Sequence, residues 1–217
     1  VQSLVGSEMC IRDRFLGDQA RKYLSEQCTT AEVRKVLNDD GMACHESLWN
    51  GIAEMGWLGT AIPEEYGGLG LGMLELCVLA EEIGRALAPV PFSSTVYMLA
   101  EALKLGGSEA QKQALLPEIA AGKVIGAYAS SEGPGAPDLS ALKTTFDGSK
   151  LNGTKIPVLD GDIATHALVT AAENSGVSLV LVDLNQAGVK RTVVKTLDPT
   201  RSPVSYTHLR AHETLDN

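Results

Sequence analysis

The sequence lacks several features that would assign it to a broad class at once. No apolar run is long enough to span a bilayer, and the N-terminus lacks the basic-then-apolar layout of a signal peptide. Both absences argue against a membrane protein and a secreted precursor. Basic residues are few, since 18 Lys and Arg against 27 Asp and Glu give a net charge of −9. Such a chain has no electrostatic attraction for a phosphate backbone, which makes nucleic acid a poor candidate partner.

Cysteine is also scarce, and its spacing excludes the familiar cysteine sites. Cys10, Cys28, Cys44 and Cys77 form no CxxC pair and have no histidine at zinc-ligand spacing, so no metal site is expected. Reduced thiols in a cytoplasmic protein are the expectation. With 44% hydrophobic and 21% charged residues, the composition is that of a folded chain of one large or two small domains.

The two ends of the chain are related at the level of codons. When residue i is paired with residue 217 − i, every pair from Val1/Asp216 to Arg14/Pro203 is encodable by reverse-complementary codons. An inverted DNA repeat read through in frame explains this run, and the translated ends resemble those of transposase-based sequencing adaptors. We therefore expect residues 1–14 and 203–217 to be non-native tails around a native segment, Phe15–Ser202, that is cut from a longer protein.

The native segment changes its periodicity near Gly122–Val124. Residues 15–123 contain helical patterns, with S/T-x-x-E/Q capping boxes at Thr29 and Ser108. Residues 124–202 contain short β-like runs separated by turn signals such as Asp147-Gly148. Helices followed by consecutive strands predict an α+β fold, with an all-α N-terminal domain before a β domain, and not a Rossmann alternation.

Most candidate site residues have an ordinary structural explanation. Gly67–Gly72 (GGLGLG) follows a helix and has the wrong glycine spacing for dinucleotide binding, so a loop that shapes a helix entry is favoured. Glu64 and Glu65 are adjacent and do not face each other, which favours a solvated loop over paired acid/base catalysis. His45 and His166 have no Ser, Cys or Asp partner at an interpretable spacing.

The segment Ser130–Asp138 (SSEGPGAPD) is a stronger candidate. It is a loop of small residues that leaves a predicted strand, and its two hydroxyls and free backbone N–H groups could hold the polar edge of a ligand. By this pattern alone, a ligand loop and a plain turn are about equally supported.

The order of the motifs resembles that of the acyl-CoA dehydrogenase family across essentially all of Phe15–Ser202. The resemblance rests on four segments, which are similar to the family's N-terminal signature, a following helix, its flavin loop and its β-hairpin: Gly56–Gly70, Gly107–Gln113, Tyr128–Asp138 and Leu151–Lys155. It implies a helical domain, a β-barrel-like middle domain and a C-terminal four-helix domain that this chain lacks.

The resemblance also implies a reaction and its participants. These are FAD as cofactor, α,β-dehydrogenation of an acyl-CoA thioester in fatty acid metabolism, electron-transfer flavoprotein as electron acceptor, and a homo- or hetero-oligomer. The family's base, a carboxylate, usually lies in the C-terminal domain, so no residue of this chain is assigned to that role and the chain alone is expected to be inactive. The implied cofactor-binding residues are Tyr128, Ser130, Ser131, Pro157 and Leu159, with Pro137 at the substrate.

Several of these positions depart from the family pattern. Gly133 stands where Pro is usual, and Pro137 stands where a Ser usually meets flavin or substrate. Pro157 and Leu159 replace a Trp and a Thr that flank the flavin, and Pro157 has no backbone N–H to donate. These losses leave two alternatives beside an active dehydrogenase: a non-catalytic partner subunit of a heteromeric acyl-CoA dehydrogenase, or a related flavin-dependent monooxygenase.

Overall fold

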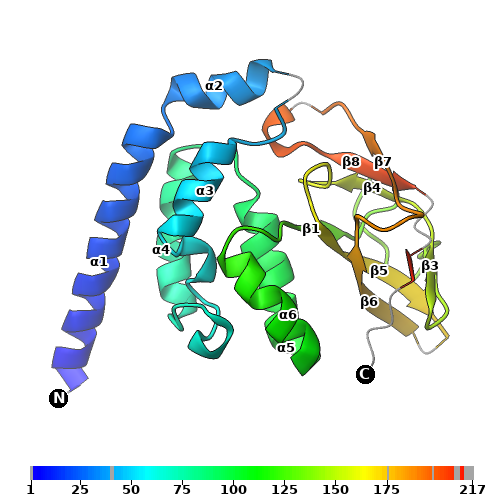
Figure 1. Ribbon diagram of the computed structural model, residues 1–217, viewed down its shortest axis with the longest axis horizontal. Coiled ribbons are helices and arrows are strands. Elements are labelled where there is room, and N and C mark those ends of the chain that lie inside the picture. The colour runs from blue at the N-terminus through cyan, green and yellow to red at the C-terminus, as the bar shows by residue number, and fades with distance from the viewer. Residues whose placement is uncertain (1, 40–41, 175, 197, 208–210, 213–217) are drawn as a thin grey trace.

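The computed structural model describes residues 2–39, 42–174, 176–196, 198–207 and 211–212. Figure 1 shows helices in one half of the molecule and strands in the other, in chain order. The predicted α+β architecture is therefore confirmed. Within the described residues, none of the helices combines the length and the apolar character that crossing a membrane requires.

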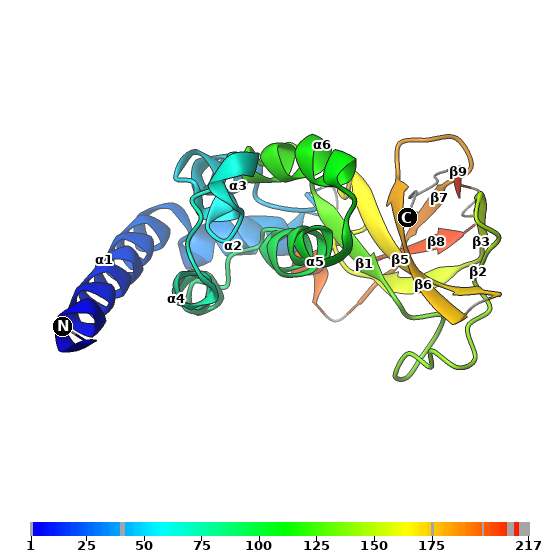
Figure 2. The same ribbon diagram turned by 90° about the horizontal axis from the view of Figure 1, so that it is seen from below.

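The helical half is built around the core that α1, α3 and α4 enclose. Ala20 and Leu24 of α1, Ile52 of α3 and Leu79 of α4 are buried in it. The N-terminal part of α1 extends beyond the other helices (Figure 2). The helices are α1 Gln2–Gln27, α2 Thr30–Asn38, α3 Glu46–Glu54, α4 Met73–Arg85, the π-helix η3 Ser93–Ala100, α5 Glu101–Gly106 and α6 Glu109–Ala120, with short 3-10 turns η1 Trp57–Gly59, η2 Glu64–Tyr66 and η4 Pro199–Arg201.

Local capping determines where several helices begin. Thr29 is the N-cap of α2 and accepts from the Glu32 backbone N–H at 3.4 Å. Ser108 and Gln111 form a complete capping box at the start of α6, because each side chain accepts from the other residue's backbone N–H. The predicted starts at these positions are confirmed.

The β half consists of two open sheets. One has six strands in the order β1-β5-β2-β3-β9, with β6 paired to β5, and the other has the order β4-β8-β7. The predicted barrel-like closure is wrong for the described residues, since the strands belong to separate sheets. The strands are β1 Gly126–Ala129, β2 Thr145–Phe146, β3 Lys150–Asn152, β4 Lys155–Val158, β5 His166–Glu173, β6 Gly176–Asp183, β7 Lys190–Val193, β8 Val204–Thr207 and β9 Ala211–His212.

The central strand of the larger sheet is β5. It pairs in parallel with β1 through Gly126–Ala129 and antiparallel with β6 over the whole length of β6. Among the described strands β6 pairs with β5 alone, so it forms an edge of the sheet. Val177 and Leu179 on this edge strand are about half exposed, at 49% and 44%.

Both ends that the sequence assigns to flanking DNA have regular structure. Helix α1 begins at Gln2, and strand β8 pairs with β4 and β7. Tyr206 of β8 is fully buried, and its hydroxyl donates to the Gly161 carbonyl at 2.8 Å. The residues at the C-terminal end therefore fill part of the β core.

The two halves are joined by an apolar cluster and by hydrogen bonds between η3 and a buried ion pair of the β half. Leu99, Leu116 and Ile119 of the helical half pack in one buried cluster with Leu168 of β5 and Leu181 of β6. At another point of the junction, the Arg201 guanidinium donates to both carboxylate oxygens of Asp160, at 3.0 and 2.7 Å. Ser94 of η3 also donates to this carboxylate, at 2.5 Å, and Arg201 donates to the Ser93 hydroxyl at 2.9 Å.

Candidate functional site

The candidate site lies where β1 ends and β4 runs beside it. The Ile156 backbone N–H donates to the Ser131 carbonyl at 2.9 Å, and Glu132 and Ile156 form a parallel bridge. The loop that begins at Ser130 is therefore hydrogen-bonded along the segment that contains Pro157. Two segments that the sequence singled out separately, Tyr128–Asp138 and the end of the hairpin, lie side by side in the fold.

The predicted site residues present side chains at the surface of this junction. Tyr128 is 37% exposed and alternates with buried neighbours on β1, so its ring points away from the β core. Pro157 is exposed and Leu159 is 48% exposed. Ser130 and Ser131 are half-buried, and within the described part of the chain neither hydroxyl bonds to another residue. Pro137 lies further along the same loop and is exposed.

Three residues bond to one another and to the loop and hold it in place: Glu132, Lys155 and Thr170. We call them the Lys155 cluster. The sequence did not single them out for this role. The side chain of Lys155 is completely buried. Its ammonium donates to Glu132 Oε1 at 2.9 Å, to Thr170 Oγ1 at 3.1 Å and to the Ser130 carbonyl at 3.4 Å. Glu132 accepts in turn from the backbone N–H groups of Lys143 and Thr144, at 2.7 and 2.9 Å.

The charges of the Lys155 cluster are tightly coupled. Burial alone would raise the pKa of Glu132, but hydrogen bonds from Thr144, Lys143 and Lys155 lower it to about 2. Burial lowers the pKa of Lys155, and its bond with Glu132 opposes that effect. At neutral pH Glu132 is an ionised carboxylate whose bonds are used for structure, so it is not available as a base.

The segment after β4 is fixed by Asp160, which bonds Arg201 through both its backbone and its side chain. Asp160, the neighbour of Leu159, is buried in a left-handed backbone conformation at φ 56°. Its backbone N–H donates to the Arg201 carbonyl at 3.1 Å, while its carboxylate binds the Arg201 side chain. The site surface is therefore held at both ends, by the Lys155 cluster and by Asp160.

The glycine-rich loop has no free cradle for a phosphate. The backbone N–H groups of residues 68–71 donate to carbonyls within residues 59–63, at 2.9 to 3.1 Å. A Cβ on Gly68 would lie 2.0 Å from the Ile62 carbonyl oxygen, which explains the glycine there. Glu64 and Glu65 are exposed. Both glutamates lie in the 3-10 turn η2 that precedes the glycine-rich loop.

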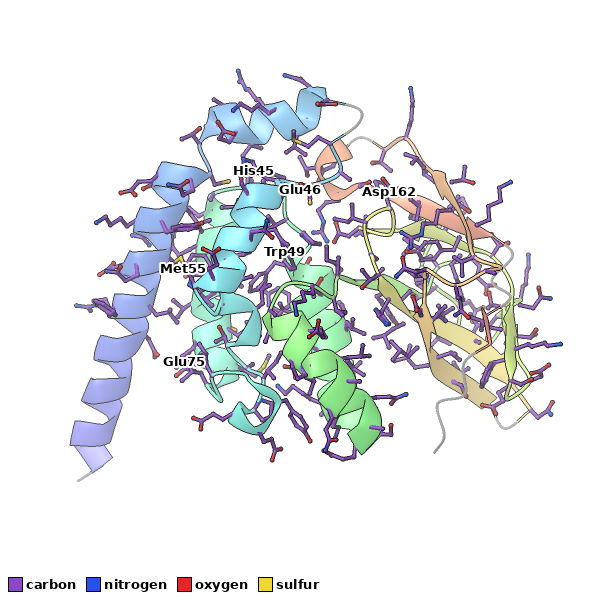
Figure 3. All side chains as sticks on the ribbon, in the orientation of Figure 1. His45, Glu46, Trp49, Met55, Glu75 and Asp162 are labelled. Atoms are coloured by element: carbon purple, nitrogen blue, oxygen red, sulfur yellow. The ribbon has the colours of Figure 1, made fainter. Side chains whose placement is uncertain are left out.

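His45 is also structural. Its Nδ1 accepts from the Leu48 backbone N–H at 3.2 Å as the N-cap of α3, and its Nε2 lies 3.1 Å from Glu32 Oε2. It lines a cavity of about 780 Å³ between the two halves, together with Glu46, Ser47 and Asp162. Figure 3 labels His45 and Glu46 at the start of α3 and Asp162 in the β half. In the described residues no group of His, Cys, Asp or Glu is arranged to hold a metal.

Comparison with known families agrees with this architecture. Residues 12–123 match the family described as "Acyl-CoA dehydrogenase, N-terminal domain". The fold class is therefore α+β, with a helical N-terminal half joined to open β-sheets. The chain belongs to the acyl-CoA dehydrogenase family.

Two curated relatives match this chain over only part of their own length. It is 33% identical over 153 residues to the mitochondrial isovaleryl-CoA dehydrogenase of Solanum tuberosum, which covers 65% of this chain and 37% of that protein. It is 30% identical over 195 residues to the acyl-CoA dehydrogenase FadE29 of Mycobacterium tuberculosis, which covers 85% of this chain and 50% of that protein. The chain spans half or less of the length of these relatives.

Solved structures match the whole arrangement of both halves. A variant of the Tcur3481-Tcur3483 steroid ACAD superposes with a TM-score of 0.83 at 33% identity, covering 94% of this chain and 56% of that one. The ChsE4-ChsE5 complex of Mycobacterium tuberculosis gives 0.82 at 26% identity, covering 93% and 55%. A Mycobacterium smegmatis glutaryl-CoA dehydrogenase in complex with FADH2 shares the fold at 22% identity and a TM-score of 0.79, covering 93% and 53%.

Proposed function

We propose that this chain forms the helical and β domains of an FAD-dependent acyl-CoA dehydrogenase, which removes the α and β hydrogens of an acyl-CoA thioester. Family membership supports the reaction class. The observation that carries the proposal for this chain is the pair of serines Ser130 and Ser131, whose hydroxyls bond to none of the described residues, at a surface that also presents apolar side chains.

The surface fits both the polar edge and an apolar face of a flavin ring system. Ser130 and Ser131 would hold its polar edge with their hydroxyls, and Tyr128, Pro157 and Leu159 would cover its apolar face. Pro137, on the exposed loop, would lie against the substrate. When bound, FAD supplies the oxidant that accepts the β-hydrogen as hydride. The protein's part is to orient the cofactor and to exclude water.

The α-proton requires a base, and this chain does not provide it in our proposal. Glu132 is committed to Lys143, Thr144 and Lys155. The family resemblance implies a carboxylate in a C-terminal domain. We therefore propose that the chain by itself does not turn over acyl-CoA, and that an assay of the purified chain with an artificial electron acceptor shows no activity.

Titration with FAD tests the cofactor proposal directly. We expect saturable quenching of flavin fluorescence, and about fivefold weaker binding for Ser131→Ala, because one hydrogen bond is worth about 1 kcal/mol. Ser149→Ala is the matched control, since the Ser149 hydroxyl bonds Asp147 in the β2–β3 hairpin. Absence of binding by the unaltered chain, or equal binding by Ser131→Ala, would contradict the proposed site.

A second candidate is a non-catalytic partner subunit of a heteromeric dehydrogenase. Pro157 and Leu159 favour it, because they lack the aromatic ring and the hydroxyl that the family usually places there. A match to a structure described as the ChsE4-ChsE5 complex agrees with such an assembly. The parent protein, expressed from its uninterrupted reading frame, purifies yellow with FAD if it is the dehydrogenase and colourless if it is the partner subunit.

The remaining assignments follow from the same proposal. Electron-transfer flavoprotein would be the electron acceptor, and a structure described as the electron transferring flavoprotein of Acidaminococcus fermentans matches this chain at 26% identity and a TM-score of 0.78, covering 92% of this chain and 55% of that one. We propose a cytoplasmic location, a domain boundary near residue 123, and flanking-DNA origin for residues 1–14 and 203–217. The source DNA sequence tests the last point.

A further inference from the structure

The Lys155 cluster connects segments that are far apart in the sequence. Glu132 follows β1, Lys155 begins β4, and Thr170 lies in the middle of β5. The Thr170 hydroxyl is within hydrogen-bond distance of the Ser130 carbonyl, at 3.4 Å, as is the Lys155 ammonium. Both buried groups therefore act on the residue where the candidate flavin loop begins.

The same cluster also closes the far end of the loop. Glu132 Oε2 accepts from the Lys143 N–H and Glu132 Oε1 accepts from the Thr144 N–H. Residues 133–142, which include Pro137, thus run between two points that one carboxylate holds together. Lys155 in turn balances that carboxylate, since its ammonium is the cation that bonds Glu132.

We propose that Lys155 is a positioning residue: its buried ammonium fixes the Ser130 carbonyl and the Glu132 carboxylate, and through them the conformation in which the loop 130–144 receives the flavin. This inference rests on the proposed function, because it assigns the loop to the cofactor. Lys155 itself does not touch the cofactor, since its side chain has no exposed surface.

Two variants and their controls test the inference in the whole chain. Lys155→Met removes the charge at similar length, and Thr170→Val removes one hydroxyl while leaving the ion pair in place. Thr170→Ser restores the hydroxyl. Lys123→Met is the matched control, because Lys123 pairs with Glu118 on the surface, where their side chains are 67% and 44% exposed.

Amide hydrogen exchange gives a measurement that does not depend on FAD. For Lys155→Met we expect at least about tenfold faster exchange at the Lys143 and Thr144 amides, in line with the loss of a hydrogen bond to a charged group. For Thr170→Val we expect a smaller increase at the same amides, because the ion pair with Glu132 stays in place. Exchange in the helical core, at Ile52 and Leu79, stays unchanged. Unchanged exchange at Lys143 and Thr144 in both variants would overturn the inference.

FAD affinity and the visible flavin spectrum complete the test. Lys155→Met and Thr170→Val should bind FAD about tenfold more weakly or more, with an altered flavin absorption band, and Thr170→Ser should restore both. Faster loop exchange with unaltered FAD affinity and spectrum overturns the positioning role. If the unaltered chain binds no FAD, the proposed function fails, and the effect of the cluster on the loop is decided by exchange alone. If Lys155→Met does not fold, Thr170→Val and Thr170→Ser decide the outcome.

Discussion

The ionised side chain of Glu132 bonds the far end of the loop 130–144 and so ties the loop to the folded β half. Its pKa of about 2 in the folded chain lies below its ordinary value of 4.5. A carboxylate with a lowered folded pKa contributes stability above the ordinary value, and this contribution is lost as the pH falls towards the folded value. We expect the free energy of unfolding, measured by urea titration, to fall between about pH 4.5 and pH 2.

Glu132→Gln isolates this effect from that of other acids. The variant should be less stable at pH 7 and should lose stability less steeply over the same pH range, since the amide does not titrate. Glu64→Gln is the control, because Glu64 is exposed in η2. An equal slope in Glu132→Gln and the unaltered chain would show that other groups cause the acid dependence.

The role of Lys155 could not be predicted from the sequence, although its position in the hairpin motif was recognised. A lysine in a short β segment is expected to be exposed, and full burial requires partners that come from other strands. Here Glu132 is 23 residues and Thr170 is 15 residues away in the chain. Sequence spacing alone does not predict that residues so far apart in the chain contact one another. Ser130 and Ser131, by contrast, could be singled out from the sequence as candidates, because loop composition is a local property.

Among the elements, α6 allows a clean test of local capping. Ser108→Ala removes the side chain that accepts from the Gln111 N–H, and we expect the free energy of unfolding to fall by about 1 kcal/mol. Urea unfolding followed by circular dichroism measures this loss. Ser25→Ala, at an exposed serine within α1, should have a smaller effect. A loss for Ser108→Ala no greater than that for Ser25→Ala would contradict the assigned cap.

Helix starts were predictable and several strands were not, for one physical reason. A capping box is complete within four residues, as at Ser108. Strand β4 contains Pro157, a residue that argues against a strand when only the sequence pattern is considered. It tolerates this proline as an edge strand of the order β4-β8-β7. Of the β-like run Leu139–Phe146, only Thr145–Phe146 pairs as strand β2, since a strand extends only as far as its partner.

For the whole molecule, the order of helices before strands was predictable because the hydrophobic period changes along the chain. Closure of the sheets was not predictable from the sequence. It depends on which distant edges meet, and here β4 joins β7 and β8 and leaves the larger sheet separate. The junction of the two halves likewise depends on long-range pairs, such as Ser94 of η3 with Asp160.

Arg201→Met tests how strongly that junction couples the two halves. Asp160 is buried, with a side chain 3% exposed, so losing its cation leaves an uncompensated charge and should cost about 3 kcal/mol. We expect one calorimetric transition for the unaltered chain and two for Arg201→Met, because the variant also loses the bond to Ser93 of the helical half. Arg34→Met, at an exposed arginine of α2, should keep one transition. One unbroken transition in Arg201→Met would assign the coupling to the apolar cluster alone.

Strand β6 bears on how the purified chain behaves in storage. Its outer edge offers backbone donors and acceptors beside the apolar side chains of Val177 and Leu179. An edge of this kind accepts an extended segment of another molecule as an additional strand. Concentrated samples are therefore prone to grow by edge-to-edge addition, and turbidity should rise with protein concentration. A lysine in place of Val177 would slow this growth, because a charge at a sheet edge resists pairing.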